Sequence, residues 1–547
     1  MIINYSVKLI TPALTGQSGV IGKDIDIVTK LDANDFPYFP AKHIKGIIRD
    51  KFEYYGLGEK DEVKQIFGFE EDEYETKIRF SHLNLSKVYG TNLSVIEDKE
   101  VLKRFLFGDR HGIRVDRETR TTIENSLFSY QYANPSLEFS SSIELKDLNK
   151  EQVKKLIATL YNIDSIGGQK SRGLGKVEVF VEGFEKKDLT KALEKVFKEI
   201  NNEKAELKDN TLSNYKFTLK FLEDAILTKS EKGNLIVSNT EINSSALRAG
   251  IIDALSNKFD FDNGKNIEKI VVEEVKPENT EILPASFYKT KYPVDGETRY
   301  KNKLFYTKDT VKSEDKKEES KLERADIKYI KEGKELKFNK ESEISIAIDR
   351  ETRSAEESKL FNFEIAKLKG EKFVITIKTT KELLEAIEGL EVYVGKMKSK
   401  GYGKAKITLA NASEKKTSLE KRIDKFSEVN KDNKFYTLDV VTDIILPFRS
   451  IKYVGEELKV LYNLEGEFLG DKSFVKVEKM AGYSLINKMP KADEIVIKAG
   501  SVLTYKGNGN LTILKELEKN GIGLRKSEGY GKIEFCSERH FLLGVGE

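Results

Sequence analysis

The chain has 547 residues, too many for one ordinary core, and its 39% hydrophobic and 34% charged residues are typical of a folded protein with a strongly solvated surface. Lys and Arg total 94 against 91 for Asp and Glu, so overall charge does not favour nucleic acid and any RNA surface must be local. The single Cys536 excludes an intrachain disulfide and a cysteine-rich zinc site, and the opening residues and lack of a long apolar run predict a soluble, cytoplasmic protein.

Strand-like and helix-like segments alternate in the first third of the chain. The hydrophobic spacing predicts strands at 4–10, 77–85 and 176–181 and helices at 42–55 and 150–163. This order predicts an α+β fold of the ferredoxin-like type, whose open sheet face is a common platform for single-stranded RNA. Apolar residues at helical spacing then predict an amphipathic connecting helix within 187–208.

Three sequence markers recur in the same order along the chain. A glycine-rich loop that leads into alternating residues occurs at 167–179, 394–407 and 521–535. The segment DRETR occurs at 116–120 and again 233 residues later at 349–353. HIKGIIRD at 43–50 resembles ALRAGIID at 246–253, which places Arg248 opposite Lys45. We therefore predict tandem modules that arose by duplication, with inserted segments.

Glycines and basic residues in these repeats are candidates for binding RNA phosphates. Glycine lets backbone N–H groups approach a phosphate closely, and Lys or Arg adds positive charge. For a single loop, a tight turn before a strand would explain the same residues. The candidates are Gly167, Gly168, Lys170, Ser171, Arg172 and Gly173 in the first loop, and Gly395, Lys396, Lys398, Lys400 and Gly401 in the second.

A second group of basic candidates lies on the predicted helix that begins near residue 42. Lys42, His43, Lys45 and Arg49 fall within two helical turns, and Arg248 holds the matching position in the second copy. Lys45 and Arg49 are four residues apart, so they share one face and could follow an RNA backbone. A solvated helix face is the alternative interpretation.

These motifs resemble those of the RAMP superfamily of CRISPR-associated proteins. Residues 1–185 resemble the RNA-cutting backbone subunit, family seven, of type III effectors, because they contain GKDIDIVTKLD at 22–32, PYFP at 37–40 and IKG at 44–46. Residues 213–547 resemble the family-five subunit of subtype D, which caps the guide at its repeat-derived tag. That resemblance depends on INSSALRAGIIDAL at 242–255, GYGK at 401–404 and LRKSEGYGKIEF at 524–535. INSSALRAG departs from the Pro-Gly-Ser pattern usual at that point.

The resemblance implies a domain plan of tandem RAMP modules. It gives a backbone-type domain at 1–185 with a thumb at about 107–135, a connecting segment at 186–212, a first capping-half module at 213–410 with an insertion at about 310–326, a linker at 411–433 and a C-terminal module at 434–547. In family-seven subunits the thumb wedges into the duplex of guide and target. We expect the same role for residues 107–135.

The resemblance also implies that Asp26 is the catalytic residue. A 2′-hydroxyl can attack its own phosphate when a carboxylate and a hydrated divalent ion such as Mg²⁺ orient the reactants, so Asp26 is expected to be a metal ligand or a proton acceptor. Asp24 and Asp32 lie close by in the sequence, and a solvated acidic loop is the alternative. The stretch after Leu227 has no equivalent loop, although Glu231 and Glu241 lie there, so we expect the second module to bind without cutting.

The expected partners are a guide CRISPR RNA, a single-stranded target RNA and other type III subunits, namely further backbone subunits, a large signalling subunit and a small helical subunit. Two alternatives to a metal-dependent endoribonuclease remain. One is a guide-RNA scaffold without catalytic activity, which metal-dependent cleavage would exclude. The other is a guide-maturation ribonuclease that uses histidine, for which the four histidines show no pairing in the sequence.

Overall fold

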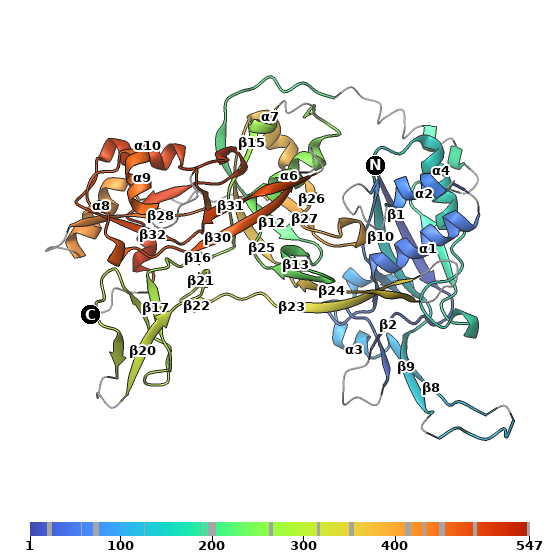
Figure 1. Cartoon of the computed structure of the whole chain (residues 1–547). Helices are drawn as coiled ribbons and strands as arrows, with labels where there is room; N and C mark the ends of the chain where they lie inside the picture. The colour runs from blue at the N-terminus through green and yellow to red at the C-terminus, as the bar shows by residue number, and fades with distance from the viewer. Residues whose placement is uncertain are drawn as a thin grey trace. The chain divides into compact units, whose positions relative to one another are not determined.

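The computed structural model describes residues 1–18, 25–55, 57–58, 60–68, 76–116, 118–124, 126–185, 188–190, 192–194, 204–261, 266–313, 318–348, 355–410, 417–429, 434–447, 454–484 and 489–543. Its contacts divide the chain into two compact units (Figure 1). The first unit comprises Met1–Glu203, Glu223–Ile226 and Gly395–Lys404, and the second comprises Lys204–Leu222, Leu227–Val394 and Ala405–Glu547.

The first unit is built around one antiparallel sheet. Its strands follow the order β11 (Val177–Val181), β1 (Ile2–Leu9), β10 (Leu137–Leu145), β6 (Leu83–Val88) and β4 (Tyr38–Phe39), with β5 (Ile78–Phe80) paired to β10 and β7 (Thr91–Asn92) paired to β6. Alternate residues of β1 are buried, and they share one core with the apolar faces of α1 (Ala41–Tyr54), α2 (Lys60–Phe67) and α4 (Lys150–Tyr161). The helices therefore cover one face of the sheet, as expected for a ferredoxin-like module.

A smaller sheet in the first unit carries a projecting hairpin. The strand order is β2 (Gly16–Ser18), β3 (Ile27–Thr29), β9 (Phe128–Ala133) and β8 (Phe107–Gly112), and α3 (Lys99–Lys103) precedes β8. All pairs are antiparallel except β3 with β9, which meet in parallel at Ile27 and Tyr130. The β8–β9 hairpin projects from the unit within the range expected for the thumb (Figure 1).

The second unit repeats this plan. Its first sheet has the order β15 (Ile270–Pro277), β25 (Lys372–Thr379), β12 (Ser213–Phe221), β27 (Lys404–Leu409) and β26 (Glu391–Tyr393), and α6 (Ser244–Leu255) packs on β15 and β26. A second sheet has the order β13 (Leu227–Lys232), β14 (Leu235–Asn239), β24 (Ala355–Ala366) and β23 (Lys340–Ile348). Its β14–β24 pair is parallel, like the β3–β9 pair of the first unit. This shared topology supports the duplication that the sequence predicts.

The remainder of the second unit contains three further groups of strands. The first group consists of β17 (Phe287–Thr290), β18 (Tyr300–Asn302), β19 (Thr310–Lys312), β20 (Glu319–Arg324), β16 (Glu281–Ile282), β21 (Tyr329–Lys331) and β22 (Lys334–Glu335). The C-terminal part has the sheet β32 (Val502–Lys506), β28 (Phe435–Val440) and β33 (Ile533–Phe535), beside β29 (Ile444–Ile445), β31 (Met489–Ile497) and β30 (Val477–Ser484). Helices α7 (Lys381–Ile387), α8 (Leu419–Val429), α9 (Val454–Tyr462) and α10 (Leu511–Asn520) complete the unit.

Several expected elements differ from those observed. The strand expected at 77–85 is two strands, because Ser81 and His82 leave the β-ladder. Residues 310–312 and 319–324 form strands rather than a solvated insertion, and α8 lies in the expected linker with Leu419 and Phe426 buried. Of the expected connecting helix, residues 189–190 and 192–194 are helical, 204–208 are not, and 195–203 lie outside the described residues. Within the described ranges no helix is both long and apolar enough to cross a membrane.

Candidate functional site

Asp26 lies immediately before β3, where the strand meets the base of the β8–β9 hairpin. Its carboxylate oxygen Oδ2 accepts hydrogen bonds from the backbone N–H of Ser129, at 2.7 Å, and from the Ser129 hydroxyl, at 3.2 Å. The N–H of Asp26 also lies 3.1 Å from the Ser129 hydroxyl oxygen, which can accept its hydrogen bond. Asp26 is exposed, and no donor of a described residue reaches its other oxygen, Oδ1. One oxygen is therefore held in place, and the other has no hydrogen-bond donor among the described residues.

A small apolar cluster joins the strand of Asp26 to the first glycine-rich loop. Leu14, Tyr130 and Leu174 form its buried centre, and Ile27 and Phe128 pack against it. Leu174 belongs to the first glycine-rich loop and Tyr130 to β9. This cluster therefore packs the first glycine-rich loop against Ile27, which follows Asp26, and against the base of the hairpin.

The first glycine-rich loop presents its basic residues to solvent. Gln169 adopts a left-handed conformation, Lys170–Arg172 form a single 3₁₀ turn, and Gly173 closes it with φ of 81°. Lys170, Ser171, Arg172 and Gly173 are exposed. The guanidinium of Arg172 lies 5.7 Å from the centre of the Phe128 ring, close enough for a cation–π contact. Arg172 is therefore positioned over the base of the hairpin.

The N–H groups of three glycines in this loop already donate hydrogen bonds to protein atoms of the first unit. Gly167 donates to Nε2 of His43 at 3.0 Å, and Gly168 donates to the Leu14 carbonyl at 2.8 Å. Gly173 donates to the Lys170 carbonyl at 3.1 Å. Contacts of this loop with phosphate therefore fall to the side chains of Lys170, Ser171 and Arg172. This differs from the sequence-based expectation, in which the glycine N–H groups bind the phosphate.

Three of the four candidate residues on helix α1 form hydrogen bonds or ion pairs within the first unit. Burial, with Lys170 and Lys42 nearby, lowers the pKa of His43 to about 4, so at neutral pH the ring is uncharged and accepts the Gly167 hydrogen bond. Lys45 Nζ lies 2.9 Å from the Ser399 hydroxyl oxygen. Arg49 Nε lies 3.4 Å from Oε1 of Glu53, one turn along the helix. His43 therefore positions a loop and carries no charge that would attract RNA.

Lys42, the fourth candidate on this helix, belongs to a cluster of positive charge. Burial, followed by the charges of Lys30 and Lys400, lowers the pKa of Lys42 to about 8. Three lysines from three separate segments therefore lie near one another within the first unit. A bound anion such as a phosphate would relieve their mutual repulsion.

The second glycine-rich loop has the same backbone as the first but is packed against α1. Met397 is left-handed, Lys398–Lys400 form the 3₁₀ turn and Gly401 has φ of 92°. A Cβ on Gly401 would lie 2.6 Å from Cβ of Ala41 and 2.8 Å from the His82 ring. Gly395 also has a positive φ, of 98°, and the N–H of Lys396 donates to Ile226. Ser399 and Gly401 are buried in this contact and are not exposed to solvent.

The third loop repeats this packing within the second unit. Arg525 is left-handed, and a Cβ on Gly529 would lie 1.9 Å from the Val272 carbonyl and 2.9 Å from Cβ of Ser244. Ala41 and Ser244 are each the first residue of a helix, α1 and α6. Tyrosine follows the closing glycine in both packed loops, as Tyr402 and Tyr530, whereas the first loop has Leu174. That tyrosine is the sequence signal that separates the packed loops from the exposed one.

Two other candidate residues have structural contacts. Arg248 donates from Nε to the Ile270 carbonyl and from Nη2 to the Ile267 carbonyl, both at 2.6 Å, so it fastens α6 to the start of β15. Asp32 accepts from the N–H groups of Asn34, at 2.8 Å, and Phe36, at 3.0 Å, and so closes a turn. Asp24 lies outside the described residues.

The second unit carries no carboxylate at the position of Asp26. Ser129 and Tyr130 correspond to Asn362 and Phe363, at the same 233-residue separation as the two DRETR segments. Ile27 pairs with Tyr130, and Ile236 pairs with Phe363. Leu235, which precedes Ile236, therefore corresponds to Asp26. The second copy of DRETR falls between β23 and β24, outside the described residues.

The residues present allow only a sparse metal site. Among the described residues no group of three or more His, Cys, Asp or Glu side chains could hold a metal ion. Mg²⁺ commonly binds through one or two carboxylates and completes its shell with water and substrate phosphate oxygens. The carboxylate of Asp26, an exposed residue, fits such a site when an RNA phosphate lies beside it. Asp26 is the one residue of this site that we expect to hold Mg²⁺.

Comparison with known proteins finds one family match, and it lies within the first unit. Residues 6–178 match the model of the RAMP superfamily. No curated protein matches the chain. A chain of the type III-B Cmr-beta complex bound to cognate target RNA is 14% identical, with a TM-score of 0.28 over 33% of this chain and 97% of that chain. A chain from the same complex with cognate target RNA and AMPPnP, in state 1, is 15% identical, with a TM-score of 0.33 over 56% and 90%. These TM-scores are too low to carry an argument.

Proposed function

We propose that this chain is a subunit of a type III RNA-guided effector that holds a guide RNA and cuts the paired target RNA with Asp26, since residues 6–178 match the RAMP superfamily model. The observation that carries this proposal is the arrangement of Asp26, an exposed residue beside the base of a projecting hairpin, whose Oδ2 accepts two hydrogen bonds from Ser129.

The proposed reaction is attack by a target 2′-hydroxyl on the adjacent phosphate, which forms a 2′,3′-cyclic phosphate and breaks the bond to the 5′-oxygen. The departing 5′-oxygen takes a proton from water. Asp26 Oδ1 accepts the hydroxyl proton, and Ser129 keeps the carboxylate oriented. A divalent ion, when bound, would offset negative charge on the phosphate. Lys170 and Arg172 of the exposed loop attract the RNA phosphates by their positive charge. Lys42, Lys30 and Lys400 add to this charge.

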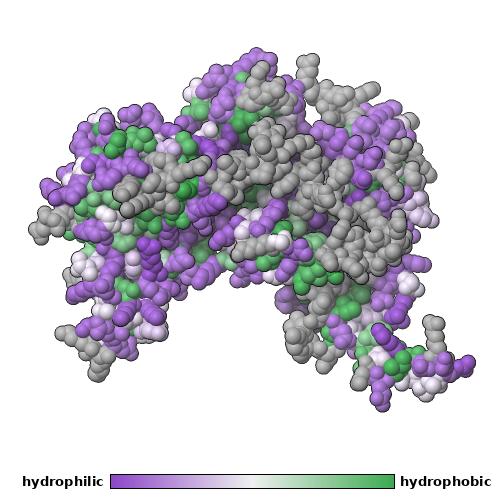
Figure 2. All heavy atoms as spheres, in the orientation of Figure 1, coloured by the Kyte–Doolittle hydropathy of each residue, from purple (hydrophilic) through white to green (hydrophobic). Residues whose placement is uncertain are grey.

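The hairpin supports a role in opening the paired RNA. Ile113, Val115, Ile123 and Leu127 lie in or beside its tip and are 45–70% exposed. Figure 2 shows apolar residues beside hydrophilic ones on this hairpin. Exposed apolar side chains on a narrow projection suit insertion between stacked bases. We propose that the hairpin is the thumb of this subunit.

Cleavage of a guide-complementary RNA by the co-purified complex tests the catalytic part. Reactions with Mg²⁺ or with EDTA are compared on a denaturing gel for wild type, Asp26→Asn and Glu97→Gln. Glu97 is an exposed acid of the first unit that has no place in the proposed reaction, so its amide variant is a matched control. We expect Asp26→Asn and EDTA to remove one product band, and Glu97→Gln to keep it.

A guide-RNA scaffold without catalysis is the second candidate, favoured by the lack of a second metal-ligating side chain near Asp26 among the described residues. Unchanged bands with Asp26→Asn, together with full retention of guide RNA, would favour this scaffold. A maturation ribonuclease is less well supported, because Nε2 of the half-buried His43 accepts a hydrogen bond from Gly167, and the buried His540 is hydrogen-bonded to Asp439.

A further inference from the structure

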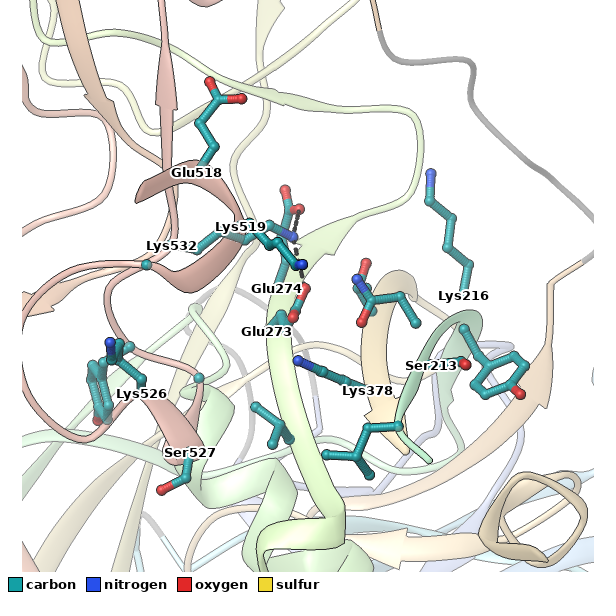
Figure 3. A pocket seen from close by; sticks show the side chains of 18 of the residues that line it. Ser213, Lys216, Glu273, Glu274, Lys378, Glu518, Lys519, Lys526, Ser527 and Lys532 are labelled. Atoms are coloured by element: carbon teal, nitrogen blue, oxygen red, sulfur yellow. Dashed lines mark hydrogen bonds and ion pairs between the residues drawn. The ribbon is translucent and has the colours of Figure 1, made fainter. Parts of the chain in front are cut away.

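The second unit contains a groove of about 1300 Å³ that none of the proposed roles uses (Figure 3). Strands β12, β25 and β15 form one side of it, and the end of α10 and the third glycine-rich loop form the other. The third loop is fixed there, because Tyr530 lies within 3.3 Å of the Asn243 amide and Gly529 packs on Val272. The groove is therefore a stable feature of this unit.

The open face of the sheet lines this groove. Phe217, Ile375 and Ile377 are fully buried on the opposite face. Side chains alternate along a strand, so the intervening residues of β12 and β25 point into the groove. Lys216 lies opposite Thr376, and Asn214 lies opposite Lys378. This face thus presents lysines, an amide and a hydroxyl side by side.

Positive charge remains in the groove after its ion pairs are accounted for. Lys532 lies 3.2 Å from Glu273 and 3.5 Å from Glu274, as the dashed lines in Figure 3 indicate. Glu518 is paired with Arg422 at 2.8 Å. By contrast, the ammonium groups of Lys378, Lys519 and Lys526 form no hydrogen bond or ion pair with any residue that the structure describes.

We propose that this groove binds the phosphodiester backbone of single-stranded RNA, with Lys378 on the sheet and Lys519 and Lys526 on the opposite wall as the phosphate contacts. The inference rests on the proposed function and adds a binding site in the second unit. Lysines on two facing walls suit a polyanion that runs along the groove. Ser213, Asn214 and Ser527 line the same groove and can bond sugar hydroxyls.

Fluorescence anisotropy with the full chain and a labelled 12-nucleotide oligouridine tests this site. The groove variant is Lys378→Gln with Lys519→Gln and Lys526→Gln. The matched control is Lys258→Gln with Lys331→Gln and Lys421→Gln, three lysines of the same unit that lie outside the groove and also lack partners among the described residues. Circular dichroism melting confirms that both triple variants are folded.

We expect the groove variant to bind more weakly and to lower the slope of log affinity against log salt by about 2, since each phosphate contact on a single strand contributes roughly 0.7. The control should keep the wild-type slope. Equal slopes for the groove variant and wild type, or an equal loss in the control, would overturn the groove site and leave the proposed function standing. A wild-type chain and complex that bind no RNA would instead overturn the proposed function.

Discussion

A carboxylate that takes a proton from RNA must keep a fixed orientation without losing its accessible oxygen. Ser129 meets this requirement for Asp26 through two hydrogen bonds to Oδ2, one from its N–H and one from its hydroxyl. Only the second depends on the side chain. The two contributions can therefore be separated by substitution at one residue.

Ser129→Ala should slow target cleavage about tenfold while leaving RNA affinity unchanged. Loss of a hydrogen bond to a charged group costs about 1.5–3 kcal/mol, and the remaining N–H bond retains part of the orientation. Single-turnover cleavage rates and anisotropy, measured on the same preparations, check both halves. Ser129→Thr keeps the hydroxyl and should recover the rate. A parallel loss of binding and cleavage would show that Ser129 supports the fold rather than Asp26.

Lys42 predicts a pH dependence of RNA binding. Its pKa is lowered to about 8 by burial and by Lys30 and Lys400, so the side chain loses its charge as pH rises from 7 to 9. RNA affinity should fall over that interval in wild type, and fall less in Lys42→Arg, whose guanidinium stays charged. Anisotropy titrations at pH 7, 8 and 9 check this. Identical pH profiles for the two proteins would exclude Lys42 from the RNA contact.

The lowered pKa of Lys42 also makes the stability of the protein depend on pH, in the direction opposite to RNA binding. An unfolded lysine keeps its proton up to about pH 10, whereas folded Lys42 releases it near 8. Between these values the unfolded state binds more protons, so the free energy of unfolding rises with pH. Binding and stability therefore change in opposite directions from pH 8 to 9, which separates loss of an RNA contact from loss of fold.

At the scale of elements, three loops share one backbone and differ in what packs on them. The closing glycines Gly173, Gly401 and Gly529 have φ between 81° and 92°. Among the described residues nothing lies within 4 Å of a Cβ on Gly173, whereas one on Gly401 meets Ala41 and His82. Gly173→Ala is therefore a control that carries the same backbone strain without the clash.

Gly401→Ala should destabilise the protein by about 1–3 kcal/mol more than Gly173→Ala, because overpacking adds to the cost of a positive φ. Thermal unfolding of the full chain should show a lower first transition for Gly401→Ala. Limited proteolysis should also cut residues 395–404 faster in that variant. Equal melting curves for the two variants would mean that the loop moves away from α1 without cost.

The periodic parts of the fold could be predicted from the sequence, and the contacts of the repeats could not. The helix expected at 42–55 is α1, and the helix expected at 150–163 is α4, because both show clear apolar spacing. The packing of Gly401 on Ala41 joins residues far apart in sequence, which spacing along the chain does not reveal. Ser129 was missed for the same reason, since it lies 103 residues from Asp26.

At the scale of the whole molecule, each unit has a sheet with the same parallel strand pair, and the two sheets differ in the residue at the position of Asp26. The parallel pair β3–β9 presents Asp26, and the equivalent pair β14–β24 presents Leu235, which cannot accept a proton. The acids that follow Leu227 in the sequence include Glu231, on β13, and Glu241, whose carboxylate is paired with Lys328. Each copy of the chain should therefore cut the target at one position only.

Glu231→Gln and Glu241→Gln should leave the pattern of target cleavage unchanged, whereas Asp26→Asn should remove one band. The amide variants keep the size of each side chain and remove the charge, so they test proton acceptance directly. Denaturing gels of the reconstituted complex, with one guide and an end-labelled target, resolve each cut to a position. A band that depends on Glu231 or Glu241 would show that the second unit has its own catalytic group, because no other subunit carries those substitutions.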